Sequence, residues 1–578
     1  MRIRSVVLFP ALLAVAIPYL QAQTTSNDTQ ENASVLKTTT RAVVVDVVVT
    51  GSNGTSVGGL DPHSFSVLED GKLQAIDFFE EHTATSGPAI TLPPLPPHVY
   101  SNEPATAPNE AVNVLLLDSL NTEEADQAYA HKEILGFLGR LQPGMRVAVY
   151  TLNTRLTLLQ GFTADAALLR AAVDSKAAAP ATTIVSRSRD DELADKDAIS
   201  AAGSPLAAQA EARSLGEYAN DQNGQSASMT LTALQQLARS LEANPGRKNL
   251  IWFASKFPVA LFPEGDNRKV LTAFHGHELP EALHETVDML TRARVALYPV
   301  SARGLMDDRT TNADNGDSGM AWNPYQESPA IRATTAMMDQ LATNTGGRAI
   351  YTTNDVSTAL TRDIQDGSHY YTVAYTPSNE KMDGTFRRIE VKLAEGKYQL
   401  AYRRGYYADA GSAPAKPASD PLAPLLAAGM PDATQIVYRL GVTPESQPAS
   451  ASARAGGNAK LQGPLRRYRV LFQIPRDSMS FLSMPSGTHD AKIRVAVVAY
   501  GRDSKPVNWA GGEMALSLNE AQYTKAKQTG IAAPMEIDLP EAELSLSTGI
   551  WDIGAQRAGT LQVPVNPKTD APADVASH

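Results

Sequence analysis

The hydrophobic pattern of the chain centres on four apolar residues, 114–117, that run directly into Asp118. An unbroken apolar run of this length predicts a strand that is buried on both faces. A helical pattern follows over 123–141, with one apolar side formed by Ile134, Leu135, Leu138 and Leu141. Asp118 is therefore expected at the carboxyl end of a central strand, where ligands bind in open α/β sheets.

Short apolar strands continue to alternate with helical patterns up to residue 368. Further strands are predicted at 145–152, 249–254, 295–300 and 348–351, and 154–160 is predicted as a hairpin partner of the first of these. Helices are predicted at 164–173, 230–241, 281–294, 331–343 and 356–366. This order predicts a doubly wound, mostly parallel sheet over 111–368. The Ala-, Ser- and charge-rich stretch 175–227 has weak periodicity and is predicted as an insertion.

Strand patterns without helices flank this α/β region. Residues 38–82 predict a small N-terminal β module, 369–408 a β extension and 435–566 a C-terminal β-sandwich. A cluster of tyrosines in the β extension is predicted to pack across strands. Composition predicts linkers at 83–110 and 409–434, and disordered segments at 23–37 and 567–578.

The N-terminus has the pattern of a secretory signal peptide. Arg2 and Arg4 precede an apolar stretch, 6–20, and small-residue cleavage after Ala22 would leave Gln23 as the mature N-terminus. An uncleaved membrane anchor is the alternative. No later stretch has the roughly 20 apolar residues of a spanning helix. We therefore expect no stable membrane span after cleavage, and a periplasmic, cell-surface or extracellular location.

Composition narrows the possible partners. The chain has no cysteine, which excludes disulfides, lipidation at a cysteine and a cysteine nucleophile. Lys and Arg number 51 against 62 for Asp and Glu, which gives a net charge of −11. Because nucleic-acid binding depends on neutralising phosphates, this balance argues against a nucleic-acid partner.

Several short sequence motifs, each of low specificity by itself, occur in a specific order. They lie at 45–49, 65–71, 117–122, 246–252, 298–304, 345–349, 383–389 and 403–407. In order and spacing, they resemble the VWFA-related family of exported bacterial proteins, over roughly 40–407 and more weakly in the C-terminal sandwich. The resemblance implies a von Willebrand A-like (Rossmann-like) domain without dinucleotide chemistry. It also implies binding of protein ligands, often through a divalent cation at the top of the sheet.

The family's cation site uses Asp-x-Ser-x-Ser after the first strand, a later loop hydroxyl, and an Asp after the fourth strand. Asp118 and Thr122 match the first and last positions of that motif, and Ser228 or Thr230 would supply the loop hydroxyl. Hard oxygen ligands of this kind suit Mg²⁺. By this resemblance, the metal ligands would be Asp118, Thr122, Ser228 and Thr230.

The match to that cation site is degenerate. Leu120 stands at the middle position and has no oxygen, while Lys256 adds a positive charge where the second carboxylate is missing. A weakly bound Mg²⁺ is thus the only cofactor that the sequence suggests. In the alternative reading, Asp118 accepts hydrogen bonds from loop amides, and Asn121 caps the following helix with Glu124 as its capping-box partner.

Other motifs point to catalysis only weakly. Residues 54–58 match a nucleophile elbow but lie between two predicted strands, and 316–319 resemble a serine-protease segment without matching partners. His275, His277 and His284 hint at zinc. The leading hypothesis is a non-enzymatic, exported protein-binding module of adhesion type. The alternatives are an exported hydrolase that uses these histidines and a structural envelope protein without a ligand.

Overall fold

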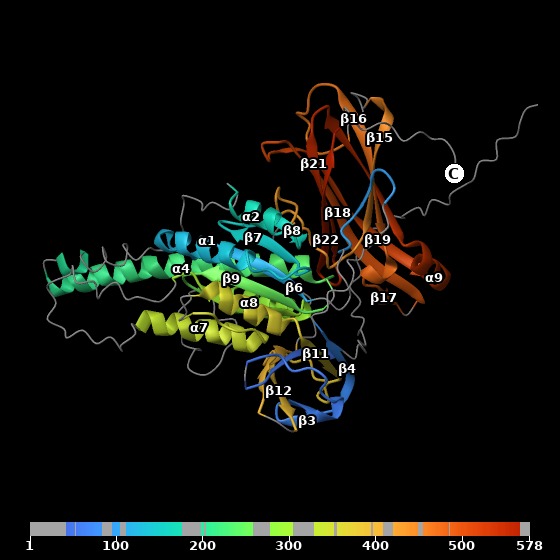
Figure 1. Cartoon of the computed structure of the whole chain (residues 1–578). Coiled ribbons are helices and arrows are strands. Elements are labelled where there is room, and N and C mark those ends of the chain that lie inside the picture. The colour runs from blue at the N-terminus through green and yellow to red at the C-terminus, as the bar shows by residue number, and fades with distance from the viewer. Residues whose placement is uncertain are drawn as a thin grey trace, which may run out of the picture.

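The computed structural model (Figure 1) places three bodies along the chain: a central α/β domain, an N-terminal β unit and a C-terminal β domain. It describes residues 42–52, 54–83, 95–104, 111–175, 198–201, 204–244, 246–257, 278–303, 329–351, 355–394, 397–408, 420–448, 455–484 and 486–566. The predicted signal peptide and the predicted disordered segments, 23–37 and 567–578, lie outside these residues. Within them, no helix is both long enough and apolar enough to cross a membrane.

The central domain contains a five-stranded sheet in the order β10-β9-β6-β7-β8. Its strands are β6 (Val112–Asp118), β7 (Val147–Leu152), β8 (Leu156–Thr163), β9 (Lys248–Ala254) and β10 (Val295–Ser301). Only the edge strand β8 runs antiparallel to its neighbour. The unbroken apolar runs thus predicted these strands correctly, and the doubly wound, mostly parallel sheet is confirmed. Of the predicted strand 348–351, Ile350 alone bridges to the sheet, at Val300.

Helices cover both faces of this sheet because successive residues of a strand point to opposite sides. Leu115 faces a core shared with α1 (Glu124–Leu138), α2 (Ala166–Val173) and α8 (Val356–Gly367). Val114 and Leu116 face a second core, shared with α4 (Pro205–Leu241), α6 (Glu278–Arg292) and α7 (Pro329–Thr345). Both faces of β6 are therefore sealed, and its carboxyl end is where side chains become accessible.

Helix α4 is much longer than the predicted helix at 230–241. It has 37 residues and begins after Ser204, whose hydroxyl accepts a bond of 3.2 Å from the Ala207 amide. The second half of the predicted insertion 175–227 is therefore helix, while 176–197 lie outside the described residues. Residues 205–225 form a helical arm about 30 Å long that runs past the carboxyl edge of the sheet (Figure 1).

The N-terminal β module and the β extension form one unit rather than two separate ones. One of its sheets has the order β13-β1-β11-β4 and the other β14-β12-β2-β3. The strands are β1 (Val43–Thr50), β2 (Phe65–Glu69), β3 (Lys72–Gln74), β4 (Ile76–His82), β11 (Tyr370–Tyr375), β12 (Phe386–Leu393), β13 (Gln399–Ala401) and β14 (Gly405–Tyr407), with a short helix, η1 (Pro62–Ser64). Strand patterns predict strands but not their partners, so the pairing of β1 with β11 was missed.

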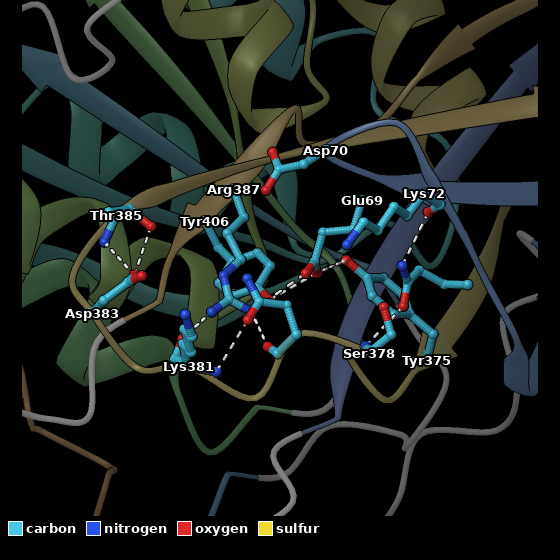
Figure 2. Close-up of polar contacts among 12 residues, drawn as sticks. Glu69, Asp70, Lys72, Tyr375, Ser378, Lys381, Asp383, Thr385, Arg387 and Tyr406 are labelled. Atoms are coloured by element: carbon cyan, nitrogen blue, oxygen red, sulfur yellow. Dashed lines mark hydrogen bonds and ion pairs between the residues drawn. The ribbon is translucent and has the colours of Figure 1, made fainter.

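A buried ion pair fixes the second sheet of this unit (Figure 2). The Arg387 guanidinium lies 3.3 Å from Oε1 of Glu69, and it also donates to the carbonyls of Asn379 and Lys381. Tyr375 and Tyr406 donate their hydroxyls to the other carboxylate oxygen, at 2.8 and 2.9 Å. The sequence motifs at 65–71, 383–389 and 403–407 therefore meet around the Glu69 carboxylate. The clustered tyrosines supply hydrogen bonds as well as packing.

The C-terminal domain has two antiparallel sheets around one shared core. The first has the order β20-β16-β15-β5; the second has the order β17-β18-β21-β22, with β19 also pairing with β18. The strands are β5 (Val99–Ser101), β15 (Arg439–Pro448), β16 (Leu465–Ile474), β17 (Leu482–Ser483), β18 (Thr488–Tyr500), β19 (Pro506–Asn519), β20 (Ile531–Pro540), β21 (Leu544–Asp552) and β22 (Arg557–Val565), with helices η4 (Arg476–Ser478) and α9 (Glu520–Thr529). Because β5 belongs to the predicted linker 83–110, that linker is in part a strand of this domain.

The second predicted linker, 409–434, also contributes to the fold. Leu422 and Leu426 pack against Trp551 in a small core, and the Thr434 amide donates to the carbonyl of Arg239 at 2.9 Å. Apolar residues spaced along a loop give no periodic signal, so composition alone suggested a linker. Its first part, 409–419, lies outside the described residues. The contact at Thr434 joins the C-terminal domain to the end of α4, away from Asp118.

Candidate binding site at the carboxyl edge of the central sheet

The Asp118 carboxylate is turned into the protein and held there by protein donors. The Asn121 amide donates to Oδ1 at 3.0 Å, and Asn121 Nδ2 and Trp252 Nε1 donate to Oδ2 at 2.7 and 2.8 Å. The residue is only 2% exposed. Burial raises the pKa of Asp118 to about 6, although these hydrogen bonds act in the opposite direction. The alternative prediction, an aspartate that accepts bonds from loop amides, is confirmed.

The residues after Asp118 explain this inward turn. Leu120 packs in the core below α4, and its amide donates to the carbonyl of Leu152 at 3.0 Å. The Thr122 hydroxyl donates to the backbone carbonyl of Asp118 at 2.6 Å. An apolar residue at position 120 thus draws the loop toward the core, and the hydroxyl at 122 closes the turn.

The two hydroxyls predicted from a loop belong to helix α4 instead. The Thr230 hydroxyl donates to the carbonyl of Ser226 at 2.7 Å and accepts from Asn121 Nδ2 at 3.0 Å. It reaches Asp118 only through Asn121. Ser228 lies on an exposed face of the helix. The prediction failed here because the helix extends 25 residues further toward the N-terminus than its periodicity indicated, from 230 back to 205.

These residues do not fit a Mg²⁺ site. Mg²⁺ requires oxygen ligands with free lone pairs in a nearly octahedral arrangement. Here three N–H groups are directed at the carboxylate of Asp118, and the Thr230 hydroxyl oxygen already accepts from Asn121 Nδ2. Elsewhere in the described part of the chain, no three His, Asp or Glu side chains come together in a way that would hold a metal.

An ion-pair cluster lies beside this loop, where α1 begins. The Glu123 carboxylate lies 3.2 Å from Lys256 Nζ and 2.8 Å from Arg303 Nη2. Asp126 lies 3.6 Å from the same guanidinium and accepts a bond of 2.6 Å from the Ser255 hydroxyl. The sequence drew attention to Lys256 but not to Asp126 or Arg303. Arg303 does lie in the motif at 298–304, which was the one available signal.

The predicted capping box of α1 does not form. Glu123 is the N-cap residue and makes no side-chain capping bond, while Asn121 uses its N–H groups on Asp118. The Asn121 carbonyl instead accepts from the amides of Ser255 and Lys256, at 3.2 and 3.0 Å. The prediction was wrong because α1 begins only at Glu124, and the backbone N–H of Asn121, from which a capping-box glutamate would have to accept, is already donated to Asp118.

A cavity of about 480 Å³ opens next to Asp118, between α1 and the end of α2. Its apolar wall includes Leu117, Ala130, Ile134, Val173 and Phe253, and its polar lining includes Ser119, Gln127, His131 and Asp174. His131 Nε2 lies 2.9 Å from Asp174 Oδ1, and both side chains are about half exposed. The volume and the mainly apolar lining are typical of ligand pockets.

Of the residues singled out for catalysis, the structure describes only His284 and the stretch 54–58. His284 lies on α6, and its ring stacks on Tyr407 with centroids 4.1 Å apart. His275, His277 and the segment 316–319 lie outside the described residues. The stretch 54–58 follows β1, with Ser56 bridged to Thr50, and leads to η1 and β2 rather than to an α-helix. It therefore lacks the strand-turn-helix context of a nucleophile elbow.

No family model and no curated protein matches the chain. Among solved structures, it is similar to an aerotolerance-related membrane protein from Bacteroides fragilis, at 10% identity and a TM-score of 0.23, over 44% of this chain and 98% of the other. A von Willebrand factor type A structure from Catenulispora acidiphila gives 10% identity and a TM-score of 0.19, over 57% and 74%. The ArnB paralog VWA2 from Sulfolobus acidocaldarius gives 9% identity and a TM-score of 0.20, over 87% and 74%.

These identities and TM-scores are too low to carry the fold assignment, which depends on the sheet itself. Its central strand β6 ends in Asp118, its edge strand β8 is antiparallel, and helices cover both of its faces. This arrangement is a doubly wound, mostly parallel α/β sheet, which is the architecture that the resemblance to VWFA-related proteins implies.

Proposed function

We propose that this chain is an exported, non-enzymatic protein-binding module of adhesion type that binds its partner without a divalent cation. The observation that carries the proposal is the state of Asp118. Its carboxylate is satisfied by three protein N–H donors and is withdrawn from the surface. A partner that approaches this edge of the sheet therefore meets side chains and not a metal ion.

The charges around the edge support the same conclusion. Glu123 and Asp126 are matched by Lys256 and Arg303, so the cluster has no net charge. A divalent cation is attracted by unneutralised carboxylates, and protein cations already neutralise these two. Because Lys256 follows β9 and Arg303 follows β10, these ion pairs also hold the start of α1 against the ends of both strands.

The cavity beside Asp118 is the part of this edge that best fits a partner. Its apolar wall would receive an apolar side chain, and the half-exposed His131–Asp174 pair would bind the polar end of that side chain. Interfaces commonly centre on one such anchor in a pocket. The helical arm, 205–225, projects beyond the same edge and extends the surface available to a partner (Figure 1).

The location follows from the sequence rather than from the fold. Arg2, Arg4 and the apolar stretch 6–20 have the pattern of a signal peptide, and no cysteine is present to be oxidised after export. We therefore place the mature protein in the periplasm, at the cell surface or outside the cell, with a protein as its partner.

The test is capture of envelope proteins by the full-length chain, with Mg²⁺ or with EDTA. We expect the same partner to be captured in both. Ala128→Trp should abolish capture because Ala128 lines the cavity and is exposed. Lys132→Trp on the same helix should not, since Lys132 is exposed but does not line the cavity.

Three results would contradict parts of this proposal. Capture that disappears in EDTA and returns with Mg²⁺ would show that a cation is used after all. Capture that is unaffected by Ala128→Trp would place the binding surface elsewhere. If neither condition yields a partner, the structural envelope role without a ligand is the better description.

A further inference from the structure

The cavity beside Asp118, between α1 and the end of α2, has a negative charge. Its lining contains the carboxylates of Asp118 and Asp174 and the imidazole of His131, and it includes no lysine or arginine among the described residues. Because the pKa of Asp118 is about 6, its carboxylate is mainly ionised at neutral pH. The lining thus has two negative charges if His131 is neutral and one if His131 is protonated. An anionic group would be repelled in either state.

Two cations on the neighbouring helices are directed away from Asp174. Arg170 precedes Asp174 by four residues on α2, but its Nη2 lies 2.6 Å from the position that a Cβ on Gly139 would take. Gly139 is about 12 Å along α1 from His131. Lys132, next to His131, is exposed and does not line the cavity. The ion-pair partner of Asp174 among the described residues is therefore the imidazole of His131, 2.9 Å from Oδ1.

Asp174 occupies a position that the local structure disfavours. It is the C-cap residue of α2, and its amide donates to the carbonyl of Arg170 at 2.9 Å. The C-terminal end of a helix has a partial negative charge, which repels an acidic side chain and stabilises a basic one. Departures from local preference of this kind are expected at functional sites. A cation bound from outside would remove the repulsion.

The polar lining of the cavity is rich in hydrogen-bond acceptors. His131 contacts Oδ1 of Asp174 and leaves Oδ2 without a partner among the described residues. The Ser175 hydroxyl donates its proton to the carbonyl of Ala172 at 2.7 Å, so its oxygen remains an acceptor. Gln127 Nε2 donates to the Thr122 carbonyl at 3.3 Å, which leaves the side-chain carbonyl of Gln127 as a further acceptor. A guanidinium group has five N–H donors and no acceptor, and so complements such a lining.

We propose that this cavity receives an arginine side chain of the protein partner, with the aliphatic stem against the apolar wall and the guanidinium group at Asp174. This inference rests on the proposed function, because it names the side chain by which the partner would be anchored. Arginine buries its methylene groups along apolar surface while its charged end stays in water. That division matches an apolar wall beside a carboxylate that is 56% exposed. Lysine has the same charge but fewer donors for the surrounding acceptors.

The test measures the binding of two small probes to the full-length protein by ligand-observed NMR titration. The first probe, n-butylguanidinium, has the stem and the charged end of arginine, and the second, n-butylurea, has nearly the same shape without the charge. We expect n-butylguanidinium to bind about threefold to fivefold more tightly, which is the size of effect that a partly exposed ion pair gives. Ala128→Trp should abolish the binding of both probes, because Ala128 lines the cavity.

Asp174→Asn should remove the preference for n-butylguanidinium while the protein still binds n-butylurea. Glu124→Gln is the matched control, since it removes one negative charge from an exposed position of α1 that does not line the cavity. This variant should retain the preference. Equal affinities of the two probes, no binding of either, or a preference that persists in Asp174→Asn would each overturn the proposal.

Capture of envelope proteins separates this inference from the proposed function. Asp174→Lys places a cation at the cavity and should abolish capture, as Ala128→Trp should. Capture that is lost in Ala128→Trp but retained in Asp174→Lys would leave the cavity as the partner's binding site and overturn arginine as the anchor. Capture that is retained in both variants would contradict the proposed function itself.

Discussion

Replacing Trp252 by phenylalanine tests whether Asp118 belongs to the interior of the protein. Phenylalanine keeps an aromatic ring packed edge-on against Phe257, where the centroids are 5.0 Å apart. It removes the indole N–H that lies 2.8 Å from Oδ2 of Asp118. The substitution therefore separates one hydrogen bond from most of the packing around it.

The expected loss depends on pH because Asp118 titrates at about 6 in the folded protein, against an ordinary value of 3.8. The folded state retains the proton longer than the unfolded state, so stability falls as pH rises from 3.8 through 6, by about 3 kcal/mol in total. In the folded protein above pH 6, the Trp252 bond goes to a carboxylate and contributes about 1.5–3 kcal/mol. Below pH 6 the acceptor is mainly neutral, and the bond contributes about 0.5–1.5 kcal/mol.

We therefore expect Trp252→Phe to cost about 1 kcal/mol more at pH 8 than at pH 5, with the loss of ring volume adding equally at both. Hydrogen exchange of peptides from β6 and β9 in the full-length chain measures the opening free energy of this domain. Trp551→Phe, in the small core of the C-terminal domain, is the matched control, and its effect should not vary with pH. An equal loss at both pH values, or a larger one at pH 5, would refute the assignment of the indole to an ionised Asp118.

Three further predictions concern other parts of the fold. Arg387→Met should destabilise the β unit by about 3–5 kcal/mol, because it leaves the Glu69 carboxylate buried without its ion-pair partner (Figure 2). Hydrogen exchange of peptides from β2 and β12 measures this loss, and the double variant with Glu69→Leu should recover part of it. Gly347→Ala should reduce the yield of folded protein, since its Cβ would clash with the Leu297 carbonyl, whereas Gly161→Ala, with open space around it, should not. Lys248→Met should raise the melting temperature at pH 6 but not at pH 10. The pKa of Lys248 is about 7 in the folded protein, against an ordinary 10.5. Protonation of Lys248 therefore lowers the free energy of unfolding fully below pH 7, and this effect disappears as the pH rises to 10.5.

The sequence predicted the central sheet well because four of its five strands, all but the edge strand β8, are buried on both faces. Such strands consist of unbroken apolar runs, and β6, β7, β9 and β10 all appear at the predicted places. The pattern could not predict which strands pair over long distances. Val45 of β1 lies opposite Val373 of β11, more than three hundred residues later, and no local signal in either strand identifies the other.

The sequence predicted where the candidate site lies in the fold, but not which side chains contact one another there. Asp118 does end the central strand, and Lys256 does add a positive charge beside it. Asp126 and Arg303 were missed because they join the site through tertiary packing of α1 against β10. Thr230 was assigned to a loop because polar residues on one side of α4 hide its helical periodicity, and a helix that projects beyond the domain has no apolar face to reveal it.

The degenerate motif and the ion-pair cluster are best understood as parts of one arrangement. With Leu120 in place of a hydroxyl, the loop gains core packing and draws Asp118 inward, where only N–H donors such as Trp252 can satisfy it. Glu123 follows that withdrawn carboxylate at the start of α1 and is itself only 13% exposed. Two largely buried, unpaired carboxylates at one helix start would repel each other. Lys256 and Arg303 remove that repulsion. The missing hydroxyl, the missing second carboxylate and the added cations are thus mutually dependent, and restoring any one residue of the family's cation motif alone should not restore cation binding.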